Sequence, residues 1–373
     1  MTKLKKAIAL ILTTVVIFMS VSCGDSDKDY IYKNDTDEYV FKHTDFVIDK
    51  NFYTYWLARY KAVLMYSYSD MDDSEEFWSQ NLGTGSAYDV LTAYADETVK
   101  NYLVSVYLFS KYGLSLGSRV NAVDSQLAEI VADGYEGNVA LLNEQAYEYG
   151  INYNMLRQIY IAEAKTETVR DYLMSVVLRS KLTDELRDSY LYDNYARTDH
   201  IFIATKYAYN IDEDGNFIYD EYGNYTQNLT DDQKREKWTL VNQIDAEGIT
   251  AENFAEYKEK YNEDTSIDSY ANGYFVSMKT DINKQYVISA LSMEVGEVKK
   301  IETDIGVYYI MKKPMIAKAY NDSKNSDFFP NYDSVVLDYL YFEEMKTHYK
   351  DIVINEELKK SISIKEVKPC FDF

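Results

Sequence analysis

The spacing of the apolar residues changes at about residue 197, and this change limits the folds that are open to the chain. From about 44 to 196, apolar residues recur every three to five positions, as they do on one face of an amphipathic helix. From 197 to 316, short apolar runs between turn residues alternate with helical segments. We therefore expect an α+β protein in which a mixed domain at 197–316 is inserted between a helical domain at 44–196 and a C-terminal segment at 317–373. The helix and tail of that last segment are expected to pack on the helical domain.

Local signals mark the ends of several expected elements. Gly113 predicts the end of a helix over 89–112, and Asn152 is placed to cap the helix that follows Gly150. The mixed domain is expected to hold strands at 200–205, 273–276 and 307–311, helices at 231–245, 251–261 and 281–291, and a small hairpin within 212–228, where Gly-Asn pairs signal turns. The tail at 361–371 alternates like an edge strand.

The first 22 residues have the composition of an export signal. Lys3, Lys5 and Lys6 form a positively charged start, and a nearly unbroken apolar stretch covers 7–19. This stretch is shorter than the roughly 20 residues that a spanning helix needs, and small residues follow it. We therefore expect a signal peptide at 1–22.

Cys23 directly follows the small residue Ser22, in a sequence that resembles the bacterial lipobox with Ser20 where leucine is usual. In a lipobox the cysteine receives a diacylglycerol and becomes the new N-terminus, so the resemblance implies that Cys23 is a lipid anchor. The polar stretch 23–43 has the composition of a tether. The mature protein is then expected on the outer face of the bacterial cytoplasmic membrane. Ordinary secretion with cleavage near Ser22 and an uncleaved anchor are the alternatives.

The rarest residue types argue against several kinds of site. Cys370 is the only other cysteine, so no intrachain disulfide is possible once Cys23 carries a lipid. The three histidines are scattered and show no ligand spacing, so we expect neither a metal nor a cofactor. His43 and His348 are interpreted as surface or helix-end residues without partners. No serine lies in a nucleophile-elbow motif, which argues against serine-hydrolase chemistry.

The mature chain is strongly acidic and rich in tyrosine. Without the three lysines of the signal peptide it has 36 basic and 62 acidic residues, a net charge of −26. No basic patch is visible, so a nucleic-acid partner is not expected. The acidic charge is interpreted as favouring solubility, with attraction for basic or unfolded polypeptides as the alternative. Most of the 39 tyrosines are expected in packing, although a groove that holds unfolded segments stays possible.

Three blocks of the mixed domain resemble parvulin-type peptidyl-prolyl isomerases. Residues 199–205, DHIFIAT, resemble the opening strand of that family, in which a histidine precedes a short apolar run. Residues 272–276, NGYFV, resemble the family's Gly-x-Phe block, and residues 291–312 resemble its closing block. The helical part is similar in layout to exported foldases of the PrsA and SurA kind, in which an isomerase domain is inserted into a helical chaperone domain.

The resemblance implies a set of catalytic residues. His200 matches the first histidine of the family's pocket, and Thr303 matches the threonine of the closing block. Asp264 falls where the family has Cys or Asp, with the neighbouring Glu263 as an alternative. Tyr308 stands where the family has a second histidine, and its hydroxyl is able to hydrogen-bond to His200, although it does not titrate near neutral pH.

The resemblance also implies substrate-binding residues. Ile282 falls where an apolar Met or Leu forms a cup for the proline ring. Tyr286 falls where a phenylalanine stacks on that ring, and Phe275 matches the phenylalanine of the second block.

Three functions are compatible with these residues. The first is a membrane-tethered foldase that binds unfolded exported proteins and catalyses cis/trans isomerisation of X-Pro bonds. The second is a holding chaperone whose isomerase-like domain has no turnover, an alternative that the replacement of the second histidine by Tyr308 keeps open. The third is a surface lipoprotein that binds a ligand or assembles structure, although no solute-binding alternation of strands and helices supports it.

Overall fold

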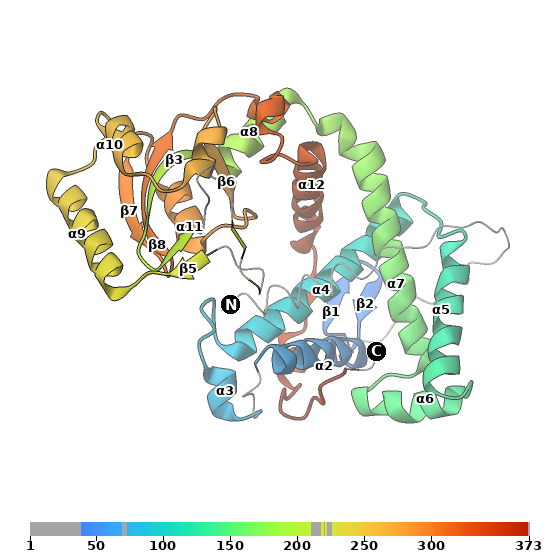
Figure 1. Cartoon of the computed structure of the whole chain (residues 1–373). Coiled ribbons are helices and arrows are strands. Elements are labelled where there is room, and N and C mark those ends of the chain that lie inside the picture. The colour runs from blue at the N-terminus through green and yellow to red at the C-terminus, as the bar shows by residue number, and fades with distance from the viewer. Residues whose placement is uncertain (1–38, 69–72, 210–217, 220, 222–225, 372–373) are drawn as a thin grey trace. The chain divides into compact units, whose positions relative to one another are not determined.

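The computed structural model describes residues 39–371 apart from 69–72, 210–217, 220 and 222–225 (Figure 1). The expected signal peptide, Cys23 and most of the expected tether lie outside the described residues. The chain divides into two compact units. The helical unit holds the residues up to Arg179 together with Asp338–Phe373, and the sheet unit is Ser180–Leu337.

The fold class is α+β, as the sequence predicted, with a sheet-bearing unit inserted between two stretches of a helical one. The boundaries expected at 197 and 316 fall inside the sheet unit. The reason is packing, because Tyr190 and Leu191 of α8 (Asp184–Asn194) and Tyr332 and Val336 of α12 (Tyr332–Tyr349) share a buried cluster with Phe275 of the sheet.

The helical unit is built from helices joined by short turns. Its helices are α2 (Lys50–Ser67), α3 (Glu75–Ser79), α4 (Ala87–Lys111), α5 (Arg119–Gly134), α6 (Val139–Ala146), α7 (Tyr153–Tyr172) and α13 (Glu356–Lys360), together with the C-terminal part of α12. The helix signals are confirmed. Asn152 caps α7 by accepting from the Met155 N–H at 3.0 Å, and Gly113 lies just beyond α4 at φ +61°.

A small sheet joins the two ends of the helical unit. Strand β1 (Phe41–His43) pairs antiparallel with both β2 (Phe46–Ile48) and β9 (Val353–Ile354). Strands of two or three residues are too short to show a period-two pattern, so the sequence did not reveal them. This pairing places the N-terminal strand beside the chain that follows α12.

Lys61 fastens the C-terminal tail to α2. Its side chain is 1% exposed, and its ammonium donates to Asp73 Oδ2 at 2.7 Å, to the Ile364 carbonyl at 2.9 Å and to the Val367 carbonyl at 2.8 Å. The three donors of the ammonium are therefore all used. The edge strand expected in the tail is wrong, since residues 361–371 form turns and two of their carbonyls turn toward Lys61.

The sheet unit has a four-stranded antiparallel sheet in the order β6-β3-β8-β7. The strands are β3 (Tyr195–Ala204), β6 (Tyr274–Ser277), β7 (Val298–Glu302) and β8 (Gly306–Lys313), and the helices α9 (Asp231–Glu247), α10 (Phe254–Tyr261) and α11 (Lys284–Ser292) pack on the sheet. Three strands and three helices overlap the expected ranges. Strand β7 was missed because its sequence, VKKIE, is too charged to read as a strand.

The two faces of the central strand β3 pack against different helices. Ala196 and Phe202 point to α11 and join a cluster with Tyr286, whereas Ile201 and Ile203 point to α9 and α10. This alternation follows from the period of two in a strand. His200 shares its face with Phe202 and therefore points toward α11.

A glycine sets how closely β8 approaches β3. A Cβ added at Gly306 would lie 2.3 Å from the Ile203 carbonyl oxygen and 2.6 Å from the Phe202 ring. Any side chain there would push the two strands apart, so Gly306 fixes the register that places Tyr308 opposite Phe202.

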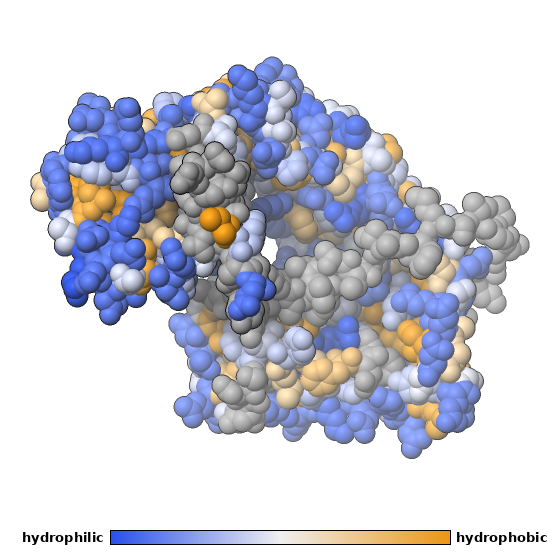
Figure 2. Space-filling model, in the orientation of Figure 1, coloured by the Kyte–Doolittle hydropathy of each residue, from blue (hydrophilic) through white to orange (hydrophobic). Residues whose placement is uncertain are grey.

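A two-stranded ribbon, β4 (Tyr207–Tyr209) with β5 (Thr226–Asn228), occupies the position of the expected hairpin, whose turn signals lie outside the described residues. Within the described part of the chain, no helix combines the length and apolar character needed to cross a membrane. Figure 2 shows hydrophilic side chains over most of one face of the molecule, in keeping with the 27% of charged residues.

Replacing the buried Lys61 tests how strongly the tail depends on it. Lys61→Met should lower the free energy of unfolding by about 3 kcal/mol, because Asp73 and two buried carbonyls lose their donor. The matched control is Lys365→Met, since Lys365 is 53% exposed and pairs only loosely with Glu75. Urea unfolding measures both variants, and equal effects of the two changes would contradict the anchoring role.

Candidate functional site

His200 lies in the middle of the central strand of the sheet unit. Its backbone is opposite Ile310 of β8, and its backbone N–H donates to Asp199 Oδ1 at 3.0 Å. Its side chain is 2% exposed on the α11 face of the sheet. Both nitrogens of its ring have hydrogen-bond partners, which lie on different elements.

The first partner is Asp264, whose Oδ2 lies 3.0 Å from His200 Nε2. Asp264 follows α10 and caps the short helix η4 (Thr265–Ser269), accepting from the Ser266 N–H at 2.9 Å and the Ser266 hydroxyl at 2.5 Å. Asn262 ties this loop to β3, because its Oδ1 accepts from the backbone N–H groups of both Phe202 and Asp264.

Glu263, the alternative to Asp264, points elsewhere. Its carboxylate accepts from the Ala204 N–H at 2.8 Å and pairs with Lys237. The structure therefore places Asp264, and not Glu263, against His200.

The charge of Asp264 follows from its contacts. Burial raises the pKa of the carboxyl, but hydrogen bonds from His200 and Ser266 outweigh burial and lower the pKa to about 2. The group is therefore an ionised carboxylate at neutral pH. Its side chain is 25% exposed, so it faces both the imidazole and the solvent.

The second partner is Tyr286 of α11, which is fully buried. Its hydroxyl lies 3.1 Å from His200 Nδ1 and 2.9 Å from Thr198 Oγ1. Asn283 caps α11 by accepting from the Gln285 and Tyr286 N–H groups, which fixes where the helix begins. Burial raises the pKa of the Tyr286 phenol further above its ordinary value, so the hydroxyl stays neutral.

The protons of this hydrogen-bonded chain have two consistent arrangements. Nε2 faces an ionised carboxylate, so Nε2 carries a proton in both of them. With neutral His200, the Tyr286 hydroxyl donates to Nδ1 and accepts from Thr198. With protonated His200, Nδ1 donates to Tyr286, Tyr286 donates to Thr198, and Thr198 donates to the Tyr274 carbonyl, 3.1 Å away.

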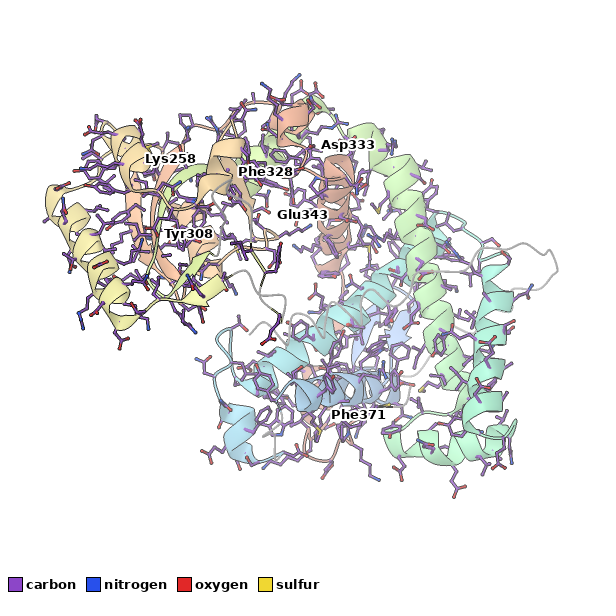
Figure 3. The ribbon with its side chains drawn as sticks, in the orientation of Figure 1. Lys258, Tyr308, Phe328, Asp333, Glu343 and Phe371 are labelled. Atoms are coloured by element: carbon purple, nitrogen blue, oxygen red, sulfur yellow. The ribbon has the colours of Figure 1, made fainter. Side chains whose placement is uncertain are left out.

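Aromatic rings enclose the imidazole. Tyr308, on β8 in Figure 3, meets it edge to face at a centroid distance of 5.2 Å, and Tyr274 lies at 6.2 Å. Tyr308 also contacts the rings of Phe202, at 4.5 Å, and Tyr286, at 5.4 Å. The sequence suggested that the Tyr308 hydroxyl, in place of the second histidine, is able to hydrogen-bond to His200. In the structure both ring nitrogens of His200 are instead occupied by Tyr286 and Asp264.

Two expected site residues lie away from His200. Thr303 closes the turn between β7 and β8, donating to the Gly306 carbonyl at 2.8 Å and accepting from the Gly306 N–H at 3.2 Å. Phe275 is 1% exposed and packs on the other face of β6, in the cluster with Tyr195 and Phe329. The structure therefore does not bring Thr303 and Phe275 to His200, unlike Asp264 and Tyr286.

The residue that sequence reasoning missed is Tyr274. It is paired with Thr198 across β6 and β3, two positions from His200, and is partly buried beside the His200 ring. Alternation could have revealed it, because neighbours on a strand point to opposite faces and Tyr274 precedes the matched Phe275.

Ile282 lies on the same side of the sheet as the aromatic residues around His200. It is partly buried and packs against the cluster that holds Phe202, Tyr286 and Tyr308. Phe202 also lines a pocket at the end of β3, whose other walls are Ala204, Tyr207, Ala208, Leu229, Lys237 and Glu263. Phe202 thus contacts both the Tyr308 ring of the site and this pocket.

Comparisons with known proteins give little beyond this geometry. No protein-family model matches the chain, and no curated protein matches it in sequence. Its similar solved structures include the foldase protein PrsA from Streptococcus pneumoniae, at 16% identity and a TM-score of 0.22 over 74% of this chain and 85% of that one. PrsA from Bacillus subtilis is 15% identical with a TM-score of 0.21, over 75% and 91% of the two chains. PrsA from Bacillus cereus, a peptidylprolyl isomerase, is 14% identical with a TM-score of 0.25, over 78% and 96%. At these scores the likeness assigns no function to this chain.

Removing the charge of Asp264 tests the bond to His200. Asp264→Asn should lower the free energy of unfolding at pH 7 by on the order of 1–2 kcal/mol, because the lowered pKa means that folding favours the ionised form. Protonation removes this contribution as the pH falls from about 4, the ordinary value, toward about 2. The difference from the unchanged protein should therefore shrink over that interval in urea unfolding. A constant difference from pH 7 to pH 3 would contradict the assignment, and Asp304→Asn, at an exposed turn position, is the control.

Proposed function

We propose that this chain is an extracytoplasmic foldase, anchored by a lipid on Cys23, that binds unfolded exported polypeptides and catalyses cis/trans isomerisation of X-Pro bonds in its sheet unit. The observation that carries the proposal is the hydrogen-bonded chain from Asp264 through His200 and Tyr286 to Thr198. These side chains come from three separate stretches of the chain, and His200 belongs to the block at 199–205 that resembles the opening strand of parvulins.

The reaction needs little from the protein except a suitable environment. Rotation about an X-Pro bond crosses a barrier of roughly 18–20 kcal/mol, because amide resonance is lost on the way. No covalent bond breaks, so neither a nucleophile nor a metal is needed. Groups that destabilise the planar amide, or stabilise the twisted one, raise the rate.

The charge on Asp264 supports such an effect. Amide resonance places negative charge on the carbonyl oxygen, and a carboxylate beside that oxygen disfavours this resonance form. Asp264 is ionised and 25% exposed, so a bound peptide is able to approach it. Its bonds to His200 and Ser266 hold the carboxylate in one orientation, as preorganised catalysis requires.

The proline ring needs an apolar surface next to that carboxylate. Ile282 and Tyr274 are both partly buried, so each keeps some surface for a ligand. Tyr286 has none, since it is fully buried. We therefore assign ring binding to Ile282 and Tyr274, and assign to Tyr286 the positioning of His200.

A holding chaperone without turnover is the second candidate. The observation that favours it is the burial of His200 and Tyr286, at 2% and 0% exposure, next to a segment whose apolar side chains are open to solvent. Met278, Ile288 and Val295 are 57%, 50% and 58% exposed. Exposed apolar side chains of this kind suit the binding of unfolded segments.

Proline-limited refolding of a model protein separates the two candidates. The mature chain without its lipid should accelerate the refolding, and both Asp264→Asn and His200→Ala should reduce kcat/KM by about tenfold or more. The first change removes the charge of the carboxylate, and the second removes the imidazole that orients it. Tyr286→Phe keeps the ring and removes only the hydroxyl, so it should cause a smaller loss. Asp304→Asn serves as the control and should leave the rate unchanged.

Aggregation of an unfolded client is measured beside the refolding rate. Suppressed aggregation without any acceleration would overturn the isomerase and support the holding chaperone. Failure in both assays would overturn the foldase proposal as a whole.

A further inference from the structure

A buried histidine of the helical unit has no hydrogen-bond partner. His43 ends strand β1, is 1% exposed, and neither of its ring nitrogens has a partner within the described residues. A buried polar group left without a partner costs roughly 1–3 kcal/mol. A histidine kept in this state therefore calls for a ligand that the polypeptide itself does not supply.

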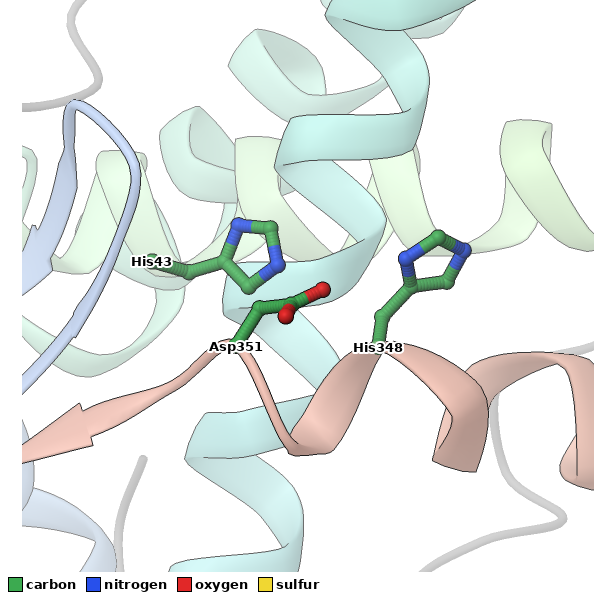
Figure 4. Close-up of side chains that lie close together, drawn as sticks. All are labelled: His43, His348 and Asp351. Carbon is green, nitrogen blue, oxygen red and sulfur yellow. The ribbon is translucent and has the colours of Figure 1, made fainter.

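Two further ligand-type side chains face this histidine from the end of α12. His348 lies in the last turn of the helix and is partly buried, and Asp351 follows three residues later and is exposed. The Asp351 N–H donates to the His348 carbonyl at 3.1 Å, so a tight turn brings the two side chains to the same place. Figure 4 shows the carboxylate of Asp351 between the two imidazole rings.

The small sheet holds the three residues in place. β1 pairs with β9, with Phe41 opposite Ile354 and Lys42 opposite Val353, so His43 lies beside the chain that leaves α12. The Asn355 N–H also donates to the Val40 carbonyl at 2.9 Å. Backbone pairing within one compact unit therefore holds His43 beside the chain that carries the other two residues.

The spacing of the ligand atoms suits a metal ion. One nitrogen from each histidine and one carboxylate oxygen all lie within 4.8 Å of one another. In a tetrahedral zinc site, with bonds of about 2.0–2.2 Å, ligand atoms lie about 3.4 Å apart. The present group is slightly wider, and the exposed Asp351 is free to turn inward.

The chemistry of the three side chains matches that of metal ligands. Histidine binds a metal through a neutral ring nitrogen, and an aspartate carboxylate adds a negative charge that offsets part of the charge of the cation. Beside this group the ring of Tyr107 lies tilted against His43, with 4.5 Å between the ring centroids, and Lys111 lies over the Tyr107 ring, 5.6 Å from its centroid.

We propose that His43, His348 and Asp351 form a binding site for a divalent transition-metal cation, with zinc as the best match. Two imidazole nitrogens and one carboxylate oxygen form a donor set that zinc accepts, and the fourth position is left for water. Magnesium and calcium prefer all-oxygen sites and are not expected to bind here. This proposal departs, for His43 and His348, from the expectation drawn from the sequence that the scattered histidines bind no metal.

A bound cation would connect the two ends of the helical unit. His43 comes from its first strand, His348 from the last turn of α12 and Asp351 from the turn that follows α12, with the whole sheet unit between His43 and the other two in sequence. If the cation binds only the folded chain, it would therefore stabilise the pairing between the two ends of the helical unit. This inference does not depend on the proposed isomerase function, because all three residues belong to the helical unit.

Calorimetric titration with zinc tests the site. The untagged mature chain, stripped of metal with a chelator, should bind one equivalent of zinc, whereas magnesium should give no such binding. His348→Asn and Asp351→Asn each remove a ligand from a position that is not fully buried, so both variants should fold. Each should weaken zinc binding by at least the roughly 10- to 100-fold that a change around a metal site costs. Asp133→Asn, an exposed carboxylate of α5, is the matched control and should bind zinc like the unchanged protein.

Two further readouts complete the test. Cobalt bound in place of zinc should give visible absorption bands that both ligand variants lose. Zinc should also raise the thermal midpoint of the unchanged protein and of Asp133→Asn, but not that of the ligand variants. Equal zinc affinity in all four proteins would assign the binding to the acidic surface and overturn the proposal. Absence of zinc binding to the unchanged protein would also overturn it, and His43 would then be a buried imidazole that only packs on Tyr107.

Discussion

The Lys61 ammonium is the interaction on which the arrangement of the chain depends. It lies on α2 near the start of the fold and holds two carbonyls of the C-terminal tail, 303 and 306 residues away. A buried ammonium is tolerated only when its donors are all satisfied, and here the tail supplies two of the three acceptors. The helical unit therefore cannot complete its own core until the end of the chain has returned to it. An inserted sheet unit is compatible with this requirement because β1 and β9 also pair the two ends.

In the sheet unit, the positions of the site residues follow from the alternation of side chains along a strand. An apolar strand buried on both faces alternates its side chains between two sets of helices, so every second residue of β3 points to α11. His200 and Thr198 are buried polar residues on that face, and His200 is accepted there because Asp264 and Tyr286 take both ring nitrogens. The same alternation excludes Phe275 from the site and brings in Tyr274.

The link between the two chain ends and the alternation along β3 decide how much of the structure is predictable from the sequence. Apolar periodicity and capping residues predicted the α+β class, most helices and three of the four strands of the main sheet, because these signals are local. His200 was proposed from the block at 199–205, and Asp264 from its place relative to the family's Cys or Asp position, with Glu263 as the alternative. The two side chains lie 3.0 Å apart, although neither block nor position predicts that contact. The hydroxyl of Tyr286 was not assigned to His200, because the contact depends on how α11 packs on the sheet. Strands β1 and β9 were missed for a similar reason, as two or three residues pair only after the chain ends have met.

The histidines show why residue type alone is a weak guide to a site. His200 and His43 are equally buried, at 2% and 1% exposure. His200 has a hydrogen-bond partner on each ring nitrogen, so the protein holds its ring in one orientation. The ring thereby connects a carboxylate and a phenol through hydrogen bonds. His43 has a hydrogen-bond partner on neither nitrogen in the part of the chain that the structure describes, while a second imidazole and a carboxylate lie within 4.8 Å. An imidazole without hydrogen-bond partners is costly in a low-dielectric interior, so the state of His43 indicates a site for a ligand. The two hydrogen bonds of His200 instead indicate a network within the protein. Sequence spacing does not distinguish these cases, because the partners of both histidines come from distant parts of the chain.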